Sequence, residues 1–493
     1  MKFRSGLALI LPPLLLCGCD LAPEYSAPIV EMPAKFKEGQ NWKEARPRDD
    51  ASRGEWWRSL NDRLLNELEP QVEISNQDIA AALAVMDQAR AFTAKAQAGL
   101  LPTVNLNNSY SANKQSAHRP TRKADRPFSA AGYTESILNN RPLNEPDHYG
   151  DNLLNLQATY EVDLWGRVRD AVAAGQAQVQ ASAAELESIR LSLQAELARD
   201  YIAMRGFDSE IKLLTDTVES YSRALALTKA LVDGQIASPA DSARAQAQLE
   251  VTRAQLFDVM ERRALLEHAI ATLIGKPAST FSIPSAATPT LSPAMPPSVP
   301  STLLERRPDI AAAERRVAAA NQSIGVARAA FFPRLTINLS GGTQDTGLSL
   351  LNMRNSIWSV GPAVTLPIFD GGARIADLRG AEAAYMETVA HYRGSVLHAI
   401  QEVEDALAAL KWLAKEAQSM SIASANAQKV LNISLALYRD GATNYLDVVT
   451  AQTAALDAER AVLAIKTRRI AANVGLMLAL GGGWSSAELA NIE

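Results

Sequence analysis

The sequence predicts a mainly α-helical protein with a membrane β-barrel portion, built from two structural repeats and assembled as a homotrimer. Three observations lead to this fold class. Four stretches alternate apolar and polar residues as half-buried strands do, very long proline-free runs follow two of them, and the whole series occurs twice along the chain. Four strands are too few to close a barrel around a lumen, whereas three copies would supply twelve.

The composition narrows the function classes. The chain has 493 residues and a formal net charge of -5, so nothing favours nucleic acid as a partner. Outside the amino terminus, no apolar run reaches the roughly 18 residues that a transmembrane helix needs. If the chain crosses a membrane, we expect strands in a closed barrel to do so.

Residues 1–18 are predicted to be a lipoprotein signal peptide, with a basic start and an apolar core. The segment ends Leu16-Cys17-Gly18-Cys19, which resembles a bacterial lipobox in which Cys19 is lipidated after cleavage. An ordinary secretory signal is the alternative. Asp20 conflicts with an outer-membrane location, because Asp at this position holds lipoproteins in the inner membrane of some bacteria. The predicted barrel strands favour the outer membrane.

Residues 19–72 are predicted to form an N-terminal arm and an equatorial segment. The segment contains Glu55-Trp56-Trp57 and a short amphipathic stretch from 60 to 72. The tryptophan pair could be a ligand platform, but we expect it to pack the arm against the body of the protein.

The first repeat is predicted to span 73–276. Its expected elements are, in order, a helix at 78–99, a strand at 103–111, a long polar loop at 112–151, a strand at 152–164 and a helical hairpin at 166–275. The first arm of this hairpin has no proline from 166 to 232, which gives a helix on the order of 100 Å long.

A proline-rich linker at 277–300 separates the repeats, and a tail at 481–493 ends the chain. The second repeat is predicted at 301–480, with a helix, strands at 334–342 and 357–368 and a helical hairpin at 371–480. Leu366 and Ile368 are expected on one face of the fourth strand.

The strand–helix junction occurs in both repeats. Alternation stops at Gly166 and Gly371, and Arg169 and Arg374 follow at identical spacing. We expect these residues to mark where a membrane barrel passes into a helical one.

Each long helix is predicted to break at a tight turn. The first turn contains Asp233 and Gly234, and the second contains Asp440 and Gly441. Glycine is the usual residue just after a helix, and aspartate suits turns. Cap and turn chemistry is therefore as good an explanation of the aspartates as a functional role.

The whole chain resembles TolC-like outer-membrane efflux proteins, in particular the lipoprotein (OprM- or NodT-like) branch that serves resistance-nodulation-division pumps. The matching motifs are Cys19 with Pro23 and Tyr25, Glu55-Trp56-Trp57, Arg306-Arg307-Pro308-Asp309-Ile310, Phe332-Pro333, Pro367-Ile368-Phe369-Asp370-Gly371-Gly372, Gln401-Glu402-Val403-Glu404-Asp405-Ala406-Leu407, and Tyr438-Arg439-Asp440-Gly441 with Tyr445-Leu446-Asp447-Val448 and Ala451-Gln452. Each motif is weak alone, but their order over nearly the whole chain is specific.

The resemblance implies a homotrimer with a twelve-stranded barrel in outer-membrane lipid, continued by an α-helical barrel through the periplasm. It implies a passive exit duct without a cofactor, joined through a periplasmic adaptor (membrane fusion) protein to an inner-membrane resistance-nodulation-division transporter. It also implies that the helix tips, including Asp233, Gly234, Asp440, Gly441 and Tyr445, contact the adaptor.

By resemblance, the pore closes at the periplasmic tips. Tyr438 and Asp447 match gate positions on the inner hairpin, and Asp241 matches the partner carboxylate. Three copies of Asp447 near the axis would form an acidic ring that favours cations.

This chain departs from the family pattern at two gate positions. Thr443 stands where the family sometimes has Arg, and Thr450 stands at a second acidic position. Arg439 is one candidate to replace the missing Arg opposite Asp241.

Three other functions remain as alternatives. A secretion duct for polypeptides would have the same internal residues. A periplasmic adaptor lipoprotein would also have long helical hairpins but would lack the duplicated strand pairs. A secreted enzyme has no motif in its favour, and His391 and His398 are too far apart along a helix to share a metal.

Overall fold

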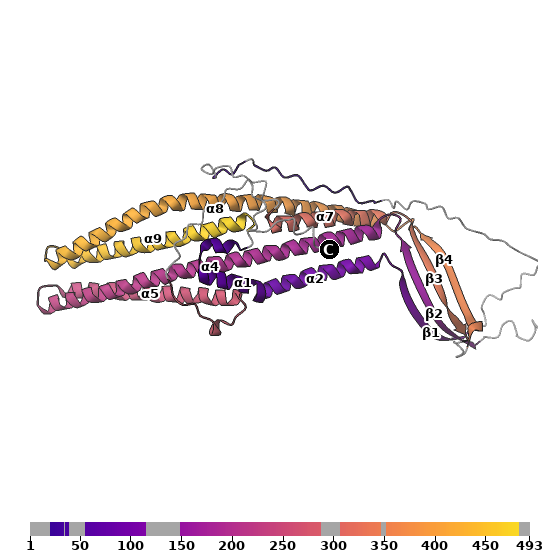
Figure 1. The fold of residues 1–493 in the computed structure, drawn as a ribbon, viewed down its shortest axis with the longest axis horizontal. Helices are drawn as coiled ribbons and strands as arrows, with labels where there is room; N and C mark the ends of the chain where they lie inside the picture. Colours follow the sequence, from indigo (N-terminus) through magenta and orange to yellow (C-terminus); the bar gives the residue numbers. More distant parts are fainter. Residues whose placement is uncertain are drawn as a thin grey trace, which may run out of the picture. The chain divides into compact units, whose positions relative to one another are not determined.

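The computed structural model describes residues 20–33, 35–38, 55–114, 148–286, 306–346 and 352–482 (Figure 1). The signal peptide with Cys19, most of the long polar loop, most of the proline-rich linker and nearly all of the tail lie outside the described residues. None of the described helices is both long enough and apolar enough to span a membrane.

The equatorial segment forms η1 Trp56–Leu60 and α1 Arg63–Ser75. The first repeat contains α2 Gln77–Ala98, β1 Thr103–Lys114, β2 His148–Val162, α4 Arg167–Asp233 and α5 Pro239–Leu273, and η2 Ala278–Thr280 follows it. The second contains α7 Pro308–Ala329, β3 Arg334–Asp345, η4 Met353–Asn355, β4 Ser356–Thr365, α8 Ala373–Arg439 and α9 Tyr445–Ala479. Helices of the two repeats match in length to the residue. α4 and α8 have 67 residues each, and α5 and α9 have 35 each.

The compact units of the structure do not follow the repeats. One unit comprises residues 1–25, 91–175 and 320–383, and the other comprises 26–90, 176–319 and 384–493. Each unit therefore takes pieces of both repeats, so the repeats are units of sequence rather than of packing.

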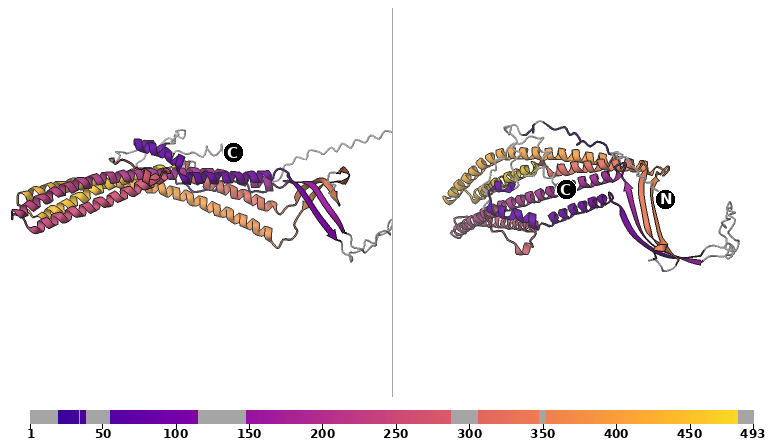
Figure 2. Two further views of the ribbon diagram at one scale, coloured as in Figure 1. Left: turned by 90° about the horizontal axis from the view of Figure 1, so that it is seen from below. Right: turned by 45° about the vertical axis from the view of Figure 1, so that its right-hand side comes forward.

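The first unit contains a four-stranded antiparallel sheet in the order β1-β2-β3-β4, whose strands lie side by side in both views (Figures 1 and 2). The two repeats meet at its centre, where Thr159 of β2 lies opposite Asn338 of β3. The register aligns apolar residues on one face. They are Val104, Leu106 and Tyr110 of β1, Leu154, Leu156, Ala158, Tyr160 and Val162 of β2, Leu335, Ile337 and Leu339 of β3, and Trp358, Val360 and Val364 of β4.

The opposite face of the sheet is polar. Asn155 donates to the Ser340 hydroxyl at 3.2 Å and the Thr159 hydroxyl donates to Asn338 at 3.3 Å, both across the β2–β3 pair. A sheet with one apolar and one polar face is what a membrane barrel needs, with lipid on one side and water on the other.

The fourth strand ends three residues earlier than the sequence predicts. β4 stops at Thr365, so Leu366 and Ile368 lie beyond it. Thr365 pairs with Arg334, the first residue of β3, so no partner residue of β3 remains opposite Leu366 and Ile368. β3 is longer than expected and continues to Asp345, because its last residues pair with the start of β2.

The second unit is held by an apolar core in which η1 and α1 pack with parts of α4, α5, α7 and α9. Trp56 and Trp57 are buried there with their rings edge to face at 5.9 Å, which fits packing rather than a ligand platform.

Corresponding residues of the two repeats secure the ends of the returning helices. Asn76 donates to the Leu273 carbonyl at the end of α5 (2.8 Å), and Arg307 donates to the Ala479 carbonyl at the end of α9 (3.1 Å). Arg307 also pairs with Glu402 of α8 at 2.5 Å. The same helix end is thus satisfied by an amide in one repeat and by a buried arginine in the other.

Glu69 on α1 is a buried acid with no partner. None of its surface is exposed, and neither carboxyl oxygen has a hydrogen-bond partner among the described residues. Burial raises the pKa of Glu69 to about 9, so the folded protein holds this carboxyl protonated at neutral pH.

We expect Glu69 to make folding stability depend on pH. Its pKa is raised from 4.5, so its neutral form stabilises the folded state fully below 4.5, and this contribution is lost as pH rises toward 9. The loss is up to about 1.4 kcal/mol per pH unit. Glu69→Gln should raise the thermal unfolding midpoint at about pH 8 and change it little at about pH 4.5.

The matched control for Glu69→Gln is Glu67→Gln. Glu67 lies on the same helix but is exposed and pairs only with Arg63. Circular dichroism at 222 nm measures the midpoint of each variant. An equal response of both variants to pH would show that Glu69 does not carry the linkage.

Candidate functional site

The two turns that join the long helices to the returning helices have the same backbone hydrogen bonds. In the first, the N–H groups of Gln235 and Ile236 donate to the carbonyls of Val232 and Leu231. In the second, those of Gly441 and Ala442 donate to Tyr438 and Leu437. This pair of bonds is the Schellman motif, which closes the C-terminus of a helix around one left-handed residue.

The left-handed residue of the first turn is Gln235, with φ 56°, and not Gly234. In the second turn it is Gly441, with φ 74°. The prediction that Gly234 and Gly441 play equivalent parts was therefore wrong. Gly441 corresponds to Gln235, and Gly234 corresponds to Asp440, as the shared hydrogen bonds show.

Tyr438 and Tyr445 lie together behind the second turn. Their rings meet edge to face at 5.1 Å, and Tyr445 is 2% exposed. They pack against Tyr221 and Leu225 of α4 and Leu249 of α5, so side chains of both hairpins meet here.

The hydroxyl group of Tyr438 is buried and has no hydrogen-bond partner among the described residues. Burial raises the pKa of Tyr438, the neighbouring Thr228 hydroxyl lowers it, and the nearby charge of Asp241 raises it again. The structure thus brings Tyr438 and Asp241 together, as two of the three predicted gate positions. A buried, unused hydroxyl can form a bond that the isolated chain does not make.

Asp241 and Asp447 occupy corresponding positions in the first turns of α5 and α9. Ser238 and Asn444 are the N-cap residues, and the Asn444 side chain accepts from the Asp447 N–H at 3.1 Å. The Thr443 hydroxyl donates to the Asp447 carboxylate. Acidic residues are favourable at this end of a helix, so both aspartates also stabilise their helices.

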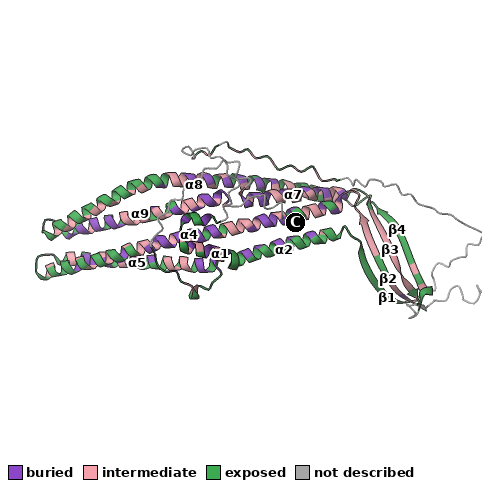
Figure 3. Cartoon of the chain, in the orientation of Figure 1, coloured by how far each residue is buried: buried purple, intermediate pink, exposed green. Residues whose placement is uncertain are grey.

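Arg439 does not pair with Asp241 within one chain. Asp241 is instead paired with Arg244 of its own helix at 3.1 Å, and Arg439 is exposed. Asp233 and Asp440 are exposed as well, and neither side chain forms a hydrogen bond or ion pair within the described residues, so they do not cap the turns. Ile236, 78% exposed, adds an apolar side chain at the first tip. Both turns are coloured as exposed in Figure 3.

The strand–helix junctions are built on glycines with positive φ and on capping aspartates. Gly166 has φ 79° and immediately precedes α4, while Gly371 and Gly372, with φ 67° and 92°, precede α8. Asp163 accepts from the Arg169 N–H at 2.9 Å and pairs with its side chain.

Asp370 caps α8 in the same way. It accepts from the N–H groups of Gly372 and Arg374 and pairs with the Arg374 side chain at 2.5 Å. Each predicted arginine therefore binds the aspartate that caps its helix. We assign the four junction residues an architectural role on these contacts.

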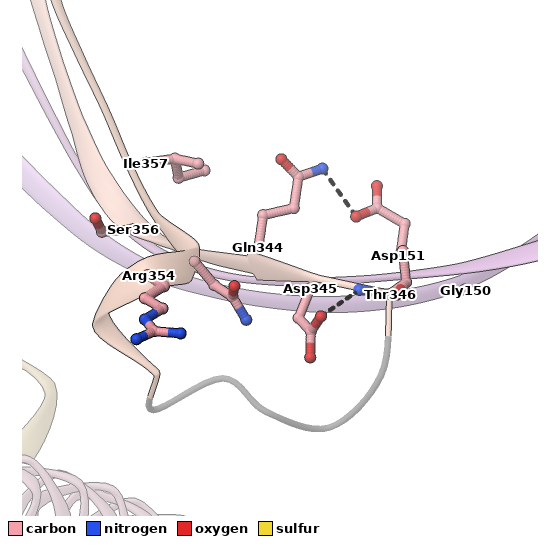
Figure 4. Close-up of a pocket in the computed structure, with 9 residues that line it drawn as sticks. Gly150, Asp151, Gln344, Asp345, Thr346, Arg354, Ser356 and Ile357 are labelled. Atoms are coloured by element: carbon pink, nitrogen blue, oxygen red, sulfur yellow. Dashed lines mark hydrogen bonds between the residues drawn. The ribbon is translucent and has the colours of Figure 1, made fainter. Parts of the chain in front are cut away.

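A cavity of about 530 Å³ lies at the other end of the sheet (Figure 4). Asp151 and Asp345 line it with Arg354, and Asp151 already accepts from Gln344 at 2.8 Å. Among the described residues, no group of three or more His, Cys, Asp or Glu side chains could hold a metal ion. The turns remain the stronger candidate site.

Comparison with known proteins identifies the family. The pattern described as "Outer membrane efflux protein" matches residues 68–276 and 299–482. The chain belongs to the outer membrane efflux protein family. Outer membrane protein OprJ of Pseudomonas aeruginosa is 30% identical over 486 residues, which cover 98% of this chain and 97% of that protein.

Two further members support the assignment. Cation efflux system protein CusC of Escherichia coli is 27% identical over 479 residues, covering 96% of this chain and 97% of that protein. The solved structure of the outer-membrane channel OprN matches with a TM-score of 0.84 at 28% identity, covering 94% of this chain and 100% of that chain. This efflux protein is therefore an outer-membrane channel with a helical periplasmic part, and its fold is that of the trimeric channels of the family.

Sequence reasoning missed two sets of residues in this efflux protein. It missed Gln235. The available signal was the spacing, because Gly234 precedes Asp241 by one residue more than Gly441 precedes Asp447. It also missed Asp163 and Asp370, which precede the junction glycines in both repeats and could have been found as helix caps.

Exchanging side chains at the two left-handed positions should change turn stability in opposite directions. Gly441→Ala places a Cβ in the left-handed region, which costs about 1–2 kcal/mol. Gln235→Gly removes that penalty and should leave the first turn equally or more stable. Amide hydrogen exchange of the turn peptides, read by mass spectrometry, measures the opening free energy.

Gly394→Ala is the control, because Gly394 lies inside α8 and an added Cβ would meet no atom within 4 Å. It should keep the turns unchanged. Equal exchange in the Gly441→Ala variant and the parent protein would contradict the assignment of Gly441 as the closing residue.

Proposed function

We propose that this channel is the exit duct of a tripartite efflux pump and that it is gated where the helical hairpins turn. The observation that carries the proposal is the cluster of Tyr438, Tyr445 and Asp241 at these turns. It combines a buried, unsatisfied hydroxyl group with carboxylates at matched positions of both hairpins. In a trimer, six such hairpins would meet at one end of the duct.

Asp447 is the residue proposed to line the constriction. It is exposed within one chain and held by Thr443 and by the N-cap of α9. A carboxylate fixed in this way keeps its orientation while it meets a neighbouring subunit. Three copies would attract cations and would repel one another unless a donor from the next chain screened them.

Arg439 is the proposed donor from the neighbouring subunit. It is exposed and uses no carboxylate of its own chain within the described residues. Asp241 already forms an ion pair with Arg244, so Arg439 would have to displace Arg244 to bind it. We therefore propose Asp447 or the unpaired Asp440, rather than Asp241, as the carboxylate that meets Arg439.

The tips outside the gate are proposed to contact a periplasmic adaptor protein. Asp233, Gly234, Asp440 and Gly441 are all exposed, whereas Tyr445, which was also expected to contact the adaptor, is 2% exposed and is not proposed as a contact. Carboxylates without partners at a helix C-terminus are unfavourable for the isolated chain, because the helix dipole is negative there. They suit an adaptor tip that presents basic side chains, and the adaptor would link the duct to an inner-membrane resistance-nodulation-division transporter.

The duct is proposed to work passively, without catalysis and without a cofactor. Transport energy would come from the inner-membrane transporter. We also propose that residues 1–18 are removed and that Cys19 is lipidated, so that an anchor in the outer membrane accompanies the barrel. Residues 73–276 and 301–480 would then be the two repeats of the mature channel, each contributing two strands and one hairpin.

Small toxic compounds or drugs are the proposed substrates. Deleting the gene should increase sensitivity to members of a panel of antibiotics, dyes and metal salts, because export would lose its outer-membrane exit. Minimum inhibitory concentrations measure the change, and a plasmid copy should restore resistance. Unchanged values for every compound would count against efflux and favour the alternative, a duct for secreted polypeptides.

Loosening the gate should raise channel conductance. Tyr438→Phe with Asp447→Ala removes the polar groups proposed to hold neighbouring hairpins together. We expect single-channel conductance in planar bilayers to rise at least several-fold, because the narrowest point dominates the resistance of a long pore. Asp447→Asn alone should reduce cation selectivity, since it removes the charge but not the shape.

Asp258→Ala is the matched control for the gate variants. Asp258 is an exposed carboxylate on α5 that pairs with Arg262 of the same helix. Conductance of this variant should equal that of the parent channel. If the double variant also conducts like the parent, Tyr438 and Asp447 do not form the gate.

A further inference from the structure

The start of the described chain is held against α7. The Asn321 side chain donates to the Pro23 carbonyl at 2.7 Å, and Arg328 donates to the Leu21 carbonyl at 3.3 Å. Asn321 is 2% exposed, and both bonds are partly buried. Side-chain donors on successive parts of an extended backbone replace the ladder partners that it lacks. We call residues 20–25 the arm start.

Gly325 allows the arm start to approach α7 and α4 closely. A Cβ at this position would lie 2.8 Å from the Ala22 Cβ and would overlap the Asp170 carboxylate. No other residue type fits there without moving one of these neighbours. Three segments, the arm start, α4 and α7, therefore meet at one glycine.

Asp170, in the first turn of α4, lies at this meeting point. It is 3% exposed, and its Oδ2 atom has no hydrogen-bond partner of ordinary geometry among the described residues. Its carboxyl group interacts with that of Asp20 on the arm start. Asp20 is held in place by its own bond from the Ala22 N–H at 2.9 Å.

The charged groups around this carboxyl pair come from every neighbouring segment. Asp163 precedes α4 and makes the site more negative, whereas Arg169 of α4 opposes it. Arg328 of α7 is directed to the Leu21 carbonyl. Asp163 and Arg169 pair with each other, so the cation that acts on Asp170 within the described residues already has a carboxylate partner.

We propose that Asp20 and Asp170 share one proton and that this contact, which we call the latch, holds the arm start against α4 and α7. The arm start is docked while the pair holds the proton and is released when the proton is lost. The latch is a regulatory contact that the efflux function does not require. The latch is separate from the proposed lipidation of Cys19. The two are close in the chain, because Asp20 follows Cys19 directly.

Charge explains why one proton controls docking. Asp170 is buried and Asp20 is exposed, and a second negative charge beside a buried carboxylate is unfavourable, so one of the two keeps its proton and donates to the other. Burial, followed by the charge of Asp20, raises the pKa of Asp170 to about 7 from 3.8. A pKa raised in the docked state means that docking is favoured at low pH and lost as pH rises through about 7. Above that value, docking should weaken by up to about tenfold per pH unit.

Spin labelling of the full, processed trimer in detergent tests the latch. Glu24 is exposed beside the docked residues, so a nitroxide on the Glu24→Cys variant reports arm mobility. We expect an immobile spectrum at about pH 5.5 and a mobile one at about pH 8.5. Asp170→Asn should stay immobile at both values, because its amide donates to Asp20 without a titrating proton. A transition that is absent from the parent, or that persists in Asp170→Asn, would overturn the proposal.

A second variant tests the geometry without a titrating group. Gly325→Ala should make the label mobile at every pH, since the added methyl group displaces Ala22. An immobile label in this variant would show that the arm start does not dock at Gly325. Asp377→Asn is the control, an exposed carboxylate of α8 whose loss should leave the transition unchanged.

Mass spectrometry of the amino-terminal peptide separates the latch from the anchor. An unacylated Cys19 would refute the proposed lipidation but leave the pH transition to be judged on its own. An acylated protein without the transition would refute the latch alone.

Discussion

The constraint on which this structure depends is that every backbone N–H and C=O group inside a membrane needs a partner. The sheet satisfies this within one chain for β2 and β3, but β1 and β4 each have only one neighbour. An unpaired group in hydrocarbon costs several kcal/mol, so two open edges cannot be left in lipid. Pairing of β1 with β4 of another copy would satisfy both edges, and the trimeric channels of the family meet this requirement by closing the sheet.

Helix and strand positions could be predicted well because single residues determine them. Pro239 occupies the first position of α5, Gly441 closes α8, and the positive φ of Gly166 ends one periodicity and begins another. The same reasoning failed where two signals competed. The apolar pattern extended β4 through Leu366 and Ile368, but its partner β3 begins at Arg334, opposite Thr365. At the first turn, Gly234 was expected to close the helix, but Gln235 takes the left-handed conformation.

Only part of the candidate gate could be predicted from the sequence. The family pattern pointed to Tyr438, Asp447 and Asp241, and the structure adds that Tyr438 packs on Tyr445 with an unused hydroxyl group. No periodicity could show this, because the contact joins α8 and α9 across their turn. Asp20 and Asp170 are also far apart in sequence, and their contact depends on a glycine in a third segment. Local sequence patterns report what a residue does to its own helix, but not what it meets across the fold.

The equal lengths of the two hairpins imply that these helices tolerate few insertions or deletions. Each consists of a 67-residue helix and a 35-residue helix joined by a short turn. One residue removed from a long helix would draw its tip back by about 1.5 Å and rotate every later side chain by about 100°. The two tips would then no longer present their turns at a common level, and the returning helix would face the wrong neighbour. Substitutions can accumulate along these helices, while the two repeats differ in length outside them, as the very different spacing of β1 and β2 compared with β3 and β4 illustrates.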